Sequence, residues 1–431
     1  MKDTYRAVQV AEGGRLELVE KQVPAPPPGE VLIAVEACGF CGADRGDIEN
    51  ADPAAGRVPG HEVVGRIVEI GANVPELWWK GQRVGVGRFG GPCLECPACR
   101  SGRLQLCRNQ PVLGSSRDGG YAEMMTARAT GLVSIPAELS SEEAAPILCA
   151  GIATFNGLKA SGAEPGDTIA ILGIGGLGHM AVQYARRMGF RVVAIGRGQD
   201  IAEDAARLGA HRYIDTHEEN APEVLTGMGG AAAILTTIGD AETVSALLPG
   251  LAPGGRLVLL GIGNDPLAVS IGQLVAGERG VVGSITGSPY ENERTLDFSV
   301  LTDARPWIQT MPLEQAQDTY DGITFLETVD GVDPDRIGIY GTSYGGAHAI
   351  WVAAFDERVK VAVSAVGVGN GDKWLRSVFS SYEWVKLKSR IREAARERVL
   401  TGKPTMVPMR YICPEDPDRP KPKLVEEIHG I

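Results

Sequence analysis

The stretch that decides the fold is Thr168-Ile-Ala-Ile-Leu-Gly-Ile-Gly-Gly-Leu-Gly178. Its apolar residues 168–172 predict a strand, its glycines follow the spacing G-x-G-x-x-G, and residues 178–188 have a helical pattern. In this context the first glycine permits a tight turn, the second lets backbone N–H groups approach a pyrophosphate, and the third allows close packing of helix and strand. The helix N-terminus adds partial positive charge. The sequence therefore predicts cofactor contacts by Gly173, Gly175, Gly176, Leu177 and Gly178, against the alternative of a glycine-rich turn without a ligand.

The segments around this loop predict the rest of an α/β protein. Apolar runs alternate with helical patterns from residue 151 to residue 285, with strands over 191–195 and 256–260 and helices over 200–208 and 243–251. This rhythm is typical of a parallel sheet covered by helices on both faces, a doubly wound Rossmann sheet. Residues 1–150 instead contain short strands separated by Gly and Pro, which predicts a β-rich domain.

Composition limits the classes of function. The 431 residues are 44% hydrophobic and carry a formal net charge of −12. An acidic chain is repelled by nucleic-acid phosphates and anionic lipids, so we expect a small-molecule partner, no nucleic acid and no membrane. The N-terminus has neither a long apolar core nor a signal-peptide pattern, and a cytoplasmic location is expected.

Cysteine spacing predicts a structural metal site. The series Cys93-x2-Cys96-x2-Cys99-x7-Cys107 supplies four thiolates on one loop. Four thiolates suit a tetrahedral Zn²⁺ ion whose coordination shell is closed to substrate. Unliganded thiols or transient disulfides are the alternative, which a reducing compartment disfavours.

A second group of metal-binding residue types is dispersed along the chain. Cys41, the pair His61-Glu62 and Cys149 lie outside the first series. Two thiolates and one imidazole would leave a tetrahedral Zn²⁺ with an open position for water or substrate oxygen. Spacing alone does not assemble these residues, and each one taken singly is more often a packed core residue.

The motifs together resemble the zinc-containing medium-chain alcohol dehydrogenase family over residues 1 to about 320. The resemblance lies in Gly60-His61-Glu62-x-x-Gly65-x5-Gly71-x-x-Val74, in Cys-Gly-Phe-Cys-Gly-Ala-Asp at 38–44, in the four-cysteine series and in Leu-Cys-Ala-Gly at 148–151. It implies a GroES-like catalytic domain over 1–150, a Rossmann domain over 151–285, a return to the catalytic domain over 286–320 and an extension over 321–431.

The same resemblance implies roles for individual residues. Cys41, His61 and Cys149 would bind the catalytic zinc, Cys38 would pack, Glu62 would be a nearby or exchanging ligand, and Asp44 would orient a ligand. Thr154 and the turn Gly261-Ile262-Gly263 would lie near the nicotinamide. The family usually carries Ser or Thr two residues after the first ligand and often His five after it, where they start a proton relay. This chain has Ala43 and Gly46 there, so the proton would leave through water or Glu62, or the reaction is altered.

The residue that distinguishes NAD(H) from NADP(H) is expected about twenty residues after the glycine loop, at the end of the strand predicted over 191–195. An acidic residue there would bind the adenosine ribose and exclude a 2′-phosphate. Here that strand ends in Gly196-Arg197. A missing carboxylate and an available guanidinium favour NADP(H) over NAD(H). The alternative is that Arg197 is only a solvated charge.

The last hundred residues depart from the dehydrogenase pattern. Residues 336–346 run Arg-Ile-Gly-Ile-Tyr-Gly-Thr-Ser-Tyr-Gly-Gly and precede a helical pattern over 347–355. This resembles the nucleophile elbow of an α/β-hydrolase, with Ser343 as the nucleophile. A strand over 336–340 is expected to lead into the elbow. The chain is too short before it for the further strands of that fold and offers no convincing acid and histidine after Ser343, so a partial α/β-hydrolase segment is predicted rather than a working triad.

The sequence therefore predicts an oxidoreductase that interconverts an alcohol and an aldehyde or ketone by hydride transfer with NADP(H), using two Zn²⁺ ions per chain. A serine hydrolase centred on Ser343 is one alternative, and a bifunctional or catalytically impaired fusion is another. The resemblance implies a homo-oligomer, a dimer or a tetramer. The identity of the substrate does not follow from the sequence, because loops that periodicity does not place would line the pocket.

Overall fold

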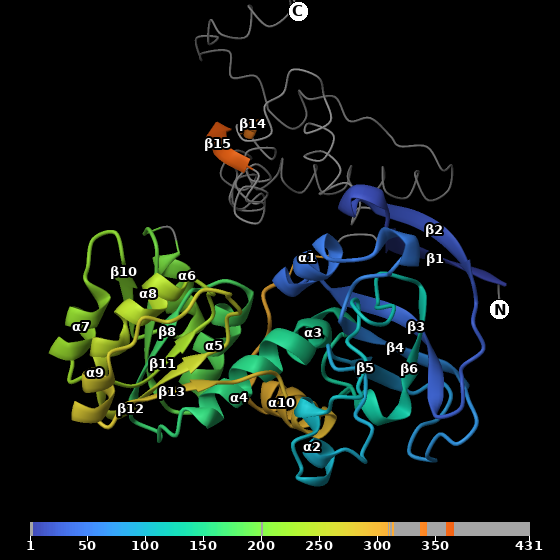
Figure 1. Ribbon diagram of the computed structural model, residues 1–431, viewed down its shortest axis with the longest axis horizontal. Coiled ribbons are helices and arrows are strands. Elements are labelled where there is room, and N and C mark those ends of the chain that lie inside the picture. Colours follow the sequence, from blue (N-terminus) through green and yellow to red (C-terminus); the bar gives the residue numbers. More distant parts are fainter. Residues whose placement is uncertain are drawn as a thin grey trace, which may run out of the picture. The chain divides into compact units, whose positions relative to one another are not determined.

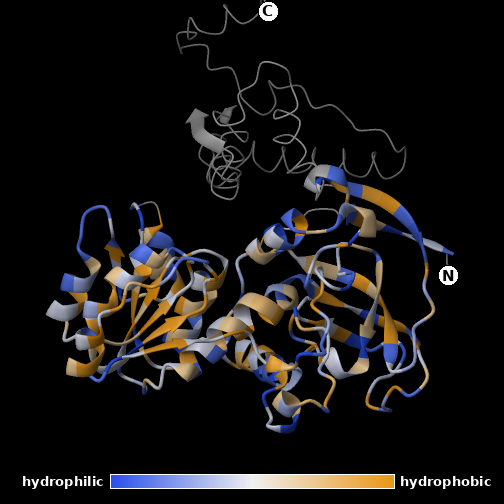
Figure 2. Ribbon diagram, in the orientation of Figure 1, coloured by the Kyte–Doolittle hydropathy of each residue, from blue (hydrophilic) through white to orange (hydrophobic). Residues whose placement is uncertain are grey.

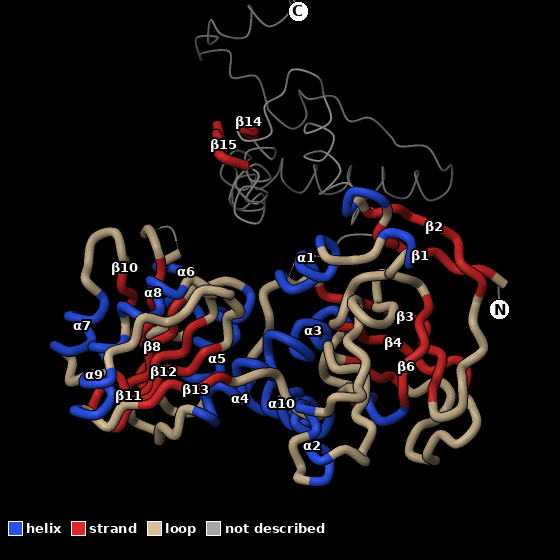
Figure 3. The backbone as a smooth tube through the Cα atoms, viewed as in Figure 1, coloured by secondary structure: helices blue, strands red, loops and turns tan. Residues whose placement is uncertain are grey.

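The computed structural model describes residues 3–199, 201–308, 310, 313, 337–342 and 359–365. The chain divides into two compact units, Met1–Thr324 and Phe325–Ile431. Figure 1 labels their helices and strands, and Figure 3 follows the same backbone by secondary structure.

The predicted doubly wound sheet is confirmed in the first unit. Its six parallel strands lie in the order β10-β9-β8-β11-β12-β13 (Figure 1). They are β8 (Thr168–Leu172), β9 (Arg191–Gly196), β10 (Arg212–Asp215), β11 (Ala231–Thr236), β12 (Leu251–Leu259) and β13 (Gly280–Gly283). From β8 the chain adds β9 and β10 on one side of the sheet and then crosses over to add β11, β12 and β13 on the other side. Ligands of such folds bind in the crevice between β8 and β11, where the strand order reverses.

Both faces of this sheet are buried because alternate residues of each strand point to opposite sides. Ile169 and Ile171 pack into one core with helix α5 (Gly176–Arg187). Ala170 and Leu172 pack into a second core with α7 (Ala221–Gly227) and α8 (Ala241–Ala246). Figure 2 shows these apolar strands with helices beside them. A strand buried on both faces requires the continuous apolar run seen in residues 168–172.

The remaining elements of the half that contains this six-stranded sheet are α6 (Ala202–Leu208), the 3₁₀ helix η6 (Leu248–Gly250) and α9 (Ile271–Ala276). The helix predicted over 243–251 is therefore too long: α8 ends at Ala246, and Leu251 already begins β12. Pro249 explains the difference, because its ring would clash with the carbonyl of Ser245 in a continued α-helix. Asp200, where α6 was expected to begin, lies outside the described residues.

The other half of the first unit, residues 3–150, is β-rich, as the sequence predicts. Its five antiparallel strands lie in the order β6-β3-β4-β5-β7, and β1 pairs with β2 separately. The strands are β1 (Thr4–Val10), β2 (Leu16–Gln22), β3 (Glu30–Gly39), β4 (Glu62–Ile70), β5 (Arg83–Val86), β6 (Met124–Arg128) and β7 (Leu132–Ser134).

The helices of this half position the site residues discussed below. They are α1 (Gly42–Glu49), α2 (Pro97–Arg100), α3 (Ser141–Pro146) and the π-helical turn η5 (Ile147–Gly151). Helix α4 (Ile152–Ala160) follows and shares a core with α5 through Leu158. Short 3₁₀ turns are η1 (Glu12–Gly14), η2 (Pro53–Ala55), η3 (Leu104–Leu106) and η4 (Ala129–Gly131).

Helix α10 (Pro289–Thr302) ties the two halves together. Ser288 caps its first turn by accepting a hydrogen bond from the Glu291 backbone N–H. The Glu293 side chain accepts a hydrogen bond from the Ser134 N–H of β7 (2.9 Å). Farther along the helix, Ser299 shares a buried hydrogen bond with the Tyr184 hydroxyl of α5 (2.7 Å). Helix α10 therefore contacts both the five-stranded antiparallel sheet, through β7, and helix α5.

In the second unit the structure describes two parallel strands, β14 (Ile337–Thr342) and β15 (Val359–Ala365). The first matches the strand predicted before the elbow. Ser343, the helix predicted over 347–355 and the chain beyond residue 365 lie outside the described residues. Among the helices that the structure describes, none has the length and apolar character needed to cross a bilayer.

Helix α10 provides a test of this packing. Leu296→Ala removes a side chain that is 0% exposed, whereas Leu301→Ala removes one on the same helix that is 83% exposed. We expect the first substitution to lower the free energy of unfolding by about 2–5 kcal/mol and the second to change it by less than about 0.5 kcal/mol. Urea denaturation followed by circular dichroism measures both. Equal effects would show that α10 does not bury Leu296.

Candidate active site and metal centres

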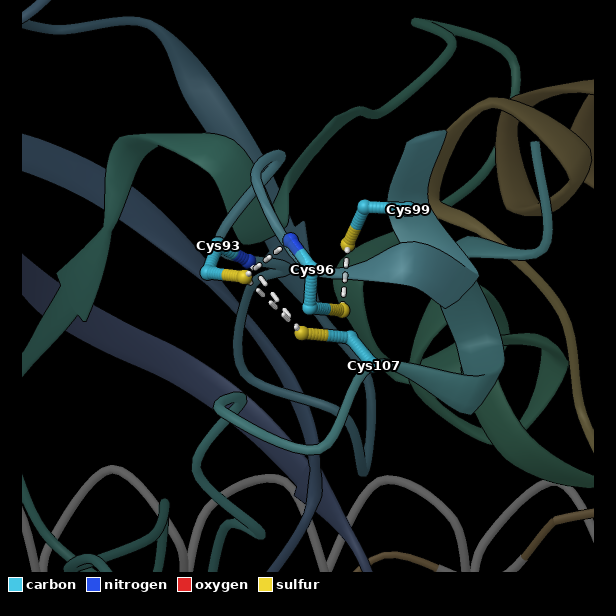
Figure 4. A group of neighbouring side chains, drawn as sticks. All are labelled: Cys93, Cys96, Cys99 and Cys107. Atoms are coloured by element: carbon cyan, nitrogen blue, oxygen red, sulfur yellow. Dashed lines mark hydrogen bonds between the residues drawn. The ribbon is translucent and has the colours of Figure 1, made fainter. Parts of the chain in front are cut away.

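The four predicted structural ligands lie together. The Sγ atoms of Cys93, Cys96, Cys99 and Cys107 are all within 4.8 Å of one another (Figure 4). The Cys96–Cys99 and Cys93–Cys107 sulfur distances are 3.6 and 3.5 Å. A tetrahedron of Zn–S bonds of about 2.3 Å has edges of about 3.8 Å, so the spacing of the sulfurs is close to what a zinc ion requires.

Hydrogen bonds at Cys93 favour its thiolate over its thiol, whereas burial raises the pKa of the Cys99 thiol. The Cys93 N–H donates to Cys107 Sγ (3.3 Å), and the Asn109 side chain and the Cys96 N–H donate to Cys93 Sγ (both 3.4 Å). Backbone N–H donors, with Asn109, lower the pKa of Cys93 to about 6. Since the thiolate is the form that ligates zinc, the donor set fits the metal.

A second cluster gathers side chains from three distant parts of the sequence. One ligand atom each of Cys41, His61, Glu62 and Cys149 lies within 4.8 Å of the others. Cys41 lies directly before α1, His61 and Glu62 at the start of β4, and Cys149 in the π-helical turn between α3 and α4. Single π-helical turns within helices occur frequently at functional sites. Cys38 is not part of this cluster and packs in the core beside it.

His61 has one nitrogen that is used and one that is not. Its Nδ1 hydrogen-bonds to Asp44 Oδ1 at 2.7 Å, and both side chains are 0% exposed. Its Nε2 is buried with no hydrogen-bond partner among the described residues. A buried, unpaired nitrogen is costly unless it binds a ligand, so Nε2 fits a metal.

The second cluster favours an anionic sulfur at Cys41, whereas the hydrogen bond with Cys41 and burial raise the pKa of Cys149. The two sulfurs of Cys41 and Cys149 are 3.9 Å apart. The hydrogen bond from Cys149 lowers the pKa of Cys41 to about 5, with His61 contributing to the shift. Burial and the nearby Cys41 raise the pKa of Glu62 to about 8. Two cysteines and one histidine at this spacing suit a zinc site that keeps an open position.

Asp44 organises this cluster through three hydrogen bonds. Besides His61, it accepts from the Cys41 N–H and the Tyr121 hydroxyl, both at 2.9 Å. Sequence reasoning missed Tyr121, because nothing in the spacing between residues 44 and 121 indicates contact. It also missed the buried Asp47, whose carboxylate pairs with both terminal nitrogens of Arg88 (2.7 and 3.0 Å) beside His61.

The predicted dinucleotide loop has the shape its glycines require. A Cβ at Gly178 would lie 1.9 Å from the Gly173 carbonyl oxygen, so only glycine permits this approach of helix and loop. At Gly175 and Gly176 an added Cβ meets no atom of the described residues within 4 Å, so these residues leave the α5 N-terminus uncovered. Thr237, at the end of β11, closes the base of the loop through its hydroxyl, which lies 3.0 Å from the carbonyls of Leu172 and Gly173. This cradle fits a pyrophosphate.

The other predicted cofactor residues lie around the ends of the parallel strands. Gly196 is the last residue of β9, and Arg197 after it is exposed. The turn Gly261-Ile262-Gly263 follows β12 and packs against Ile238 and Gly239, which follow β11. Thr154 is buried, and its hydroxyl donates to the carbonyls of Ala150 and Gly151 within its own helix (2.7 and 3.0 Å).

Family models match most of the chain. An alcohol dehydrogenase GroES-like domain matches residues 27–137, and a zinc-binding dehydrogenase domain matches residues 176–300. The prolyl oligopeptidase family matches residues 307–397.

Relatives and solved structures agree with these models. An alcohol dehydrogenase of Aspergillus sp. (strain MF297-2) is 38% identical over 325 residues, which are 75% of this chain and 95% of the relative. One from Geobacillus stearothermophilus is 38% identical over 71% of this chain and 92% of its own. Acetophenone reductase from Geotrichum candidum in complex with NAD has a TM-score of 0.66 at 25% identity, covering 75% of this chain and 95% of that one. A zinc-binding dehydrogenase from Sinorhizobium meliloti 1021 bound to NADP has a TM-score of 0.65 at 26% identity, covering 84% and 100%.

The fold and these matches define a zinc-binding dehydrogenase with a nicotinamide cofactor. The chain belongs to the zinc-containing medium-chain alcohol dehydrogenase family and carries a C-terminal segment similar to the prolyl oligopeptidase family.

Asp44 provides a test of the site's architecture. Asp44→Ala leaves three donors without their buried acceptor, so we expect the free energy of unfolding to fall by about 3–5 kcal/mol. Glu49→Ala on the same helix is the matched control, because its side chain is 56% exposed and its carboxylate pairs with Arg45 at the surface. Chemical denaturation measures both variants. A similar, small loss for both would contradict the central role of Asp44.

Proposed function

We propose that this protein interconverts an alcohol and an aldehyde or ketone by hydride transfer with NADP(H) at a zinc site formed by Cys41, His61 and Cys149. The observation that carries the proposal is the buried, unpartnered Nε2 of His61, which lies among the sulfurs of Cys41 and Cys149 and beside Glu62. Zinc bound there would polarise the substrate oxygen and lower the pKa of the alcohol.

The residues of the chain have distinct tasks in this reaction. Asp44 holds the imidazole of His61 in one orientation and fixes its tautomer by accepting the Nδ1 proton. The loop Gly173–Gly178 binds the pyrophosphate and so sets the position of the nicotinamide. Residues 1–150 and 286–320 supply the catalytic domain in this proposal, and residues 151–285 supply the cofactor domain.

A second zinc ion, bound by Cys93, Cys96, Cys99 and Cys107, has a structural role in this proposal. Its coordination shell is closed by four sulfurs, so it leaves no position for substrate.

Two observations support NADP(H) as the cofactor. No carboxylate stands at position 196, and the guanidinium of Arg197 is exposed at the end of β9, where the adenosine ribose is read. An arginine fork matches a phosphate in geometry and charge.

Metal analysis combined with turnover tests the proposal. We expect one zinc ion for each cysteine cluster, and turnover of alcohols and aldehydes that is faster with NADP(H) than with NAD(H). Cys149→Ser loses one zinc ion and the turnover while the protein stays folded. Cys99→Ser, in the other cluster, is the matched control and loses the other zinc ion. Full turnover by a Cys149→Ser protein would overturn the assignment of the catalytic site.

Ala43 provides a separate test of proton transfer. Ala43 lies in the first turn of α1 beside Cys41, and an added Cβ at Gly46 meets nothing within 4 Å. Because a hydroxyl at position 43 would offer the alcohol proton a nearby acceptor, we expect Ala43→Ser to raise kcat for alcohol oxidation about tenfold. Gly42→Ser, at the exposed neighbouring position, is the control and is expected to leave kcat unchanged.

The measurement is the pH dependence of kcat for wild type and both variants. An unchanged profile for Ala43→Ser would show that the proton already leaves by another route that is not limiting.

A further inference from the structure

The end of β9 is occupied by a neighbouring side chain. A Cβ built on Gly196 would lie 2.5 Å from the Tyr213 hydroxyl oxygen and about as close to its ring, at 3.0 Å from Cε2 and 3.1 Å from Cζ. Real Cβ atoms essentially never lie within 3.0 Å of another atom, so the 2.5 Å approach to the hydroxyl oxygen requires the Tyr213 side chain to shift. A side chain at position 196 is therefore incompatible with Tyr213 in its present place.

Strand pairing explains why Tyr213 reaches this position. In the parallel ladder, Tyr213 of β10 lies opposite Ala194 of β9, and Asp215 lies opposite Gly196. Residues 194 and 196 share one face of the sheet because side chains alternate along a strand. Since strand side chains lean along the strand direction, the Tyr213 ring extends from its partner Ala194 to Gly196.

The same strand holds the loop that follows β9. The Tyr213 hydroxyl donates to the Gly198 carbonyl at 2.7 Å. Asp215 accepts a hydrogen bond from the Gly198 N–H at 2.8 Å and one from the Gln199 side chain at 3.2 Å. Both backbone groups of Gly198 are thus held, and Gly196 is held in the ladder.

Arg197 stands between these two fixed glycines. It is exposed, and its guanidinium has no hydrogen-bond or ion-pair partner in the part of the chain that the structure describes. Hydrogen bonds with Thr243 lower the pKa of Asp240, and the charge of Arg197 adds to that shift. A backbone fixed on both sides of one residue limits where that side chain reaches.

We propose that Tyr213 determines cofactor choice in this protein. Its ring fills the space of a side chain at position 196, which excludes the carboxylate that would bind the ribose hydroxyls of NAD(H). Its hydroxyl and Asp215 hold residues 196–199 so that Arg197 faces a 2′-phosphate. This inference rests on the proposed use of NADP(H), and it adds the residue that enforces the choice.

The sterics predict a non-additive pair of substitutions. Gly196→Asp alone places its side chain against the Tyr213 ring, so we expect weaker binding of both NAD⁺ and NADP⁺. Gly196→Asp combined with Tyr213→Val removes the obstacle with a residue suited to a strand. We expect the double variant to bind NAD⁺ at least about tenfold more tightly than Gly196→Asp, and more tightly than it binds NADP⁺.

The experiment measures dissociation constants of NAD⁺ and NADP⁺ by calorimetric titration of the full-length, zinc-loaded chain. Tyr213→Phe is the control for the ring alone: it keeps the obstacle at position 196 and loses the hydrogen bond to Gly198. Thermal unfolding checks that each variant is folded. If Gly196→Asp does not fold, Gly196→Ala, alone and with Tyr213→Val, tests the steric clash by itself: we expect the single variant to bind both cofactors more weakly than the double variant.

The outcomes separate this inference from the proposed function. Equal NAD⁺ binding by Gly196→Asp and the double variant would overturn the role of Tyr213, whatever the wild type prefers. Tighter binding of NAD⁺ than NADP⁺ by the wild type would overturn the proposed NADP(H) use and the role of Arg197. Tighter binding of NADP⁺ by the wild type, reversed only in the double variant, supports both.

Discussion

The three hydrogen bonds accepted by the buried carboxylate of Asp44 are the interactions on which the candidate active site depends. They join the start of α1, the imidazole before β4 and the ring of Tyr121. These groups come from parts of the chain that are distant from one another in the sequence. Because a buried charge without partners is costly, the fold must bring all three donors to the same place. The orientation of His61, and with it the unpartnered Nε2, follows from this requirement.

A shared apolar core then relates the metal cluster to the cofactor loop. Leu148, next to Cys149, packs in the same core as Tyr184 of α5, the helix that begins at the glycine loop. Helix α10 adds Leu296 to that core and a hydrogen bond between the hydroxyls of Ser299 and Tyr184. Because protein interiors are closely packed, the π-helical turn that carries Cys149 is held at a fixed position against α5, the helix proposed to bind the pyrophosphate. Hydride transfer requires such fixed geometry between substrate and nicotinamide.

Local patterns were sufficient for much of the fold. The run 168–178 predicted a strand, a glycine loop and a helix, because a doubly buried strand must be apolar and a phosphate loop needs glycine. The helix predicted over 243–251 was wrong beyond Ala246, since the pattern of apolar residues continued through Pro249 while the backbone could not. The four-cysteine series also needed no tertiary information, because its ligands lie on one short loop.

The second cluster and the cofactor-reading end of β9 were different. Family resemblance grouped Cys41, His61 and Cys149, but periodicity does not bring together residues 108 positions apart. No sequence pattern predicted the roles of Tyr121 and Tyr213, because these roles depend on contacts with residues that are distant along the chain. Sequence alone therefore establishes the elements, the family and the local metal loop, which depend on neighbouring residues. Tertiary structure decides the second metal cluster, the acceptor that orients His61 and the space at position 196, because each depends on contacts between strands and helices that are distant along the chain.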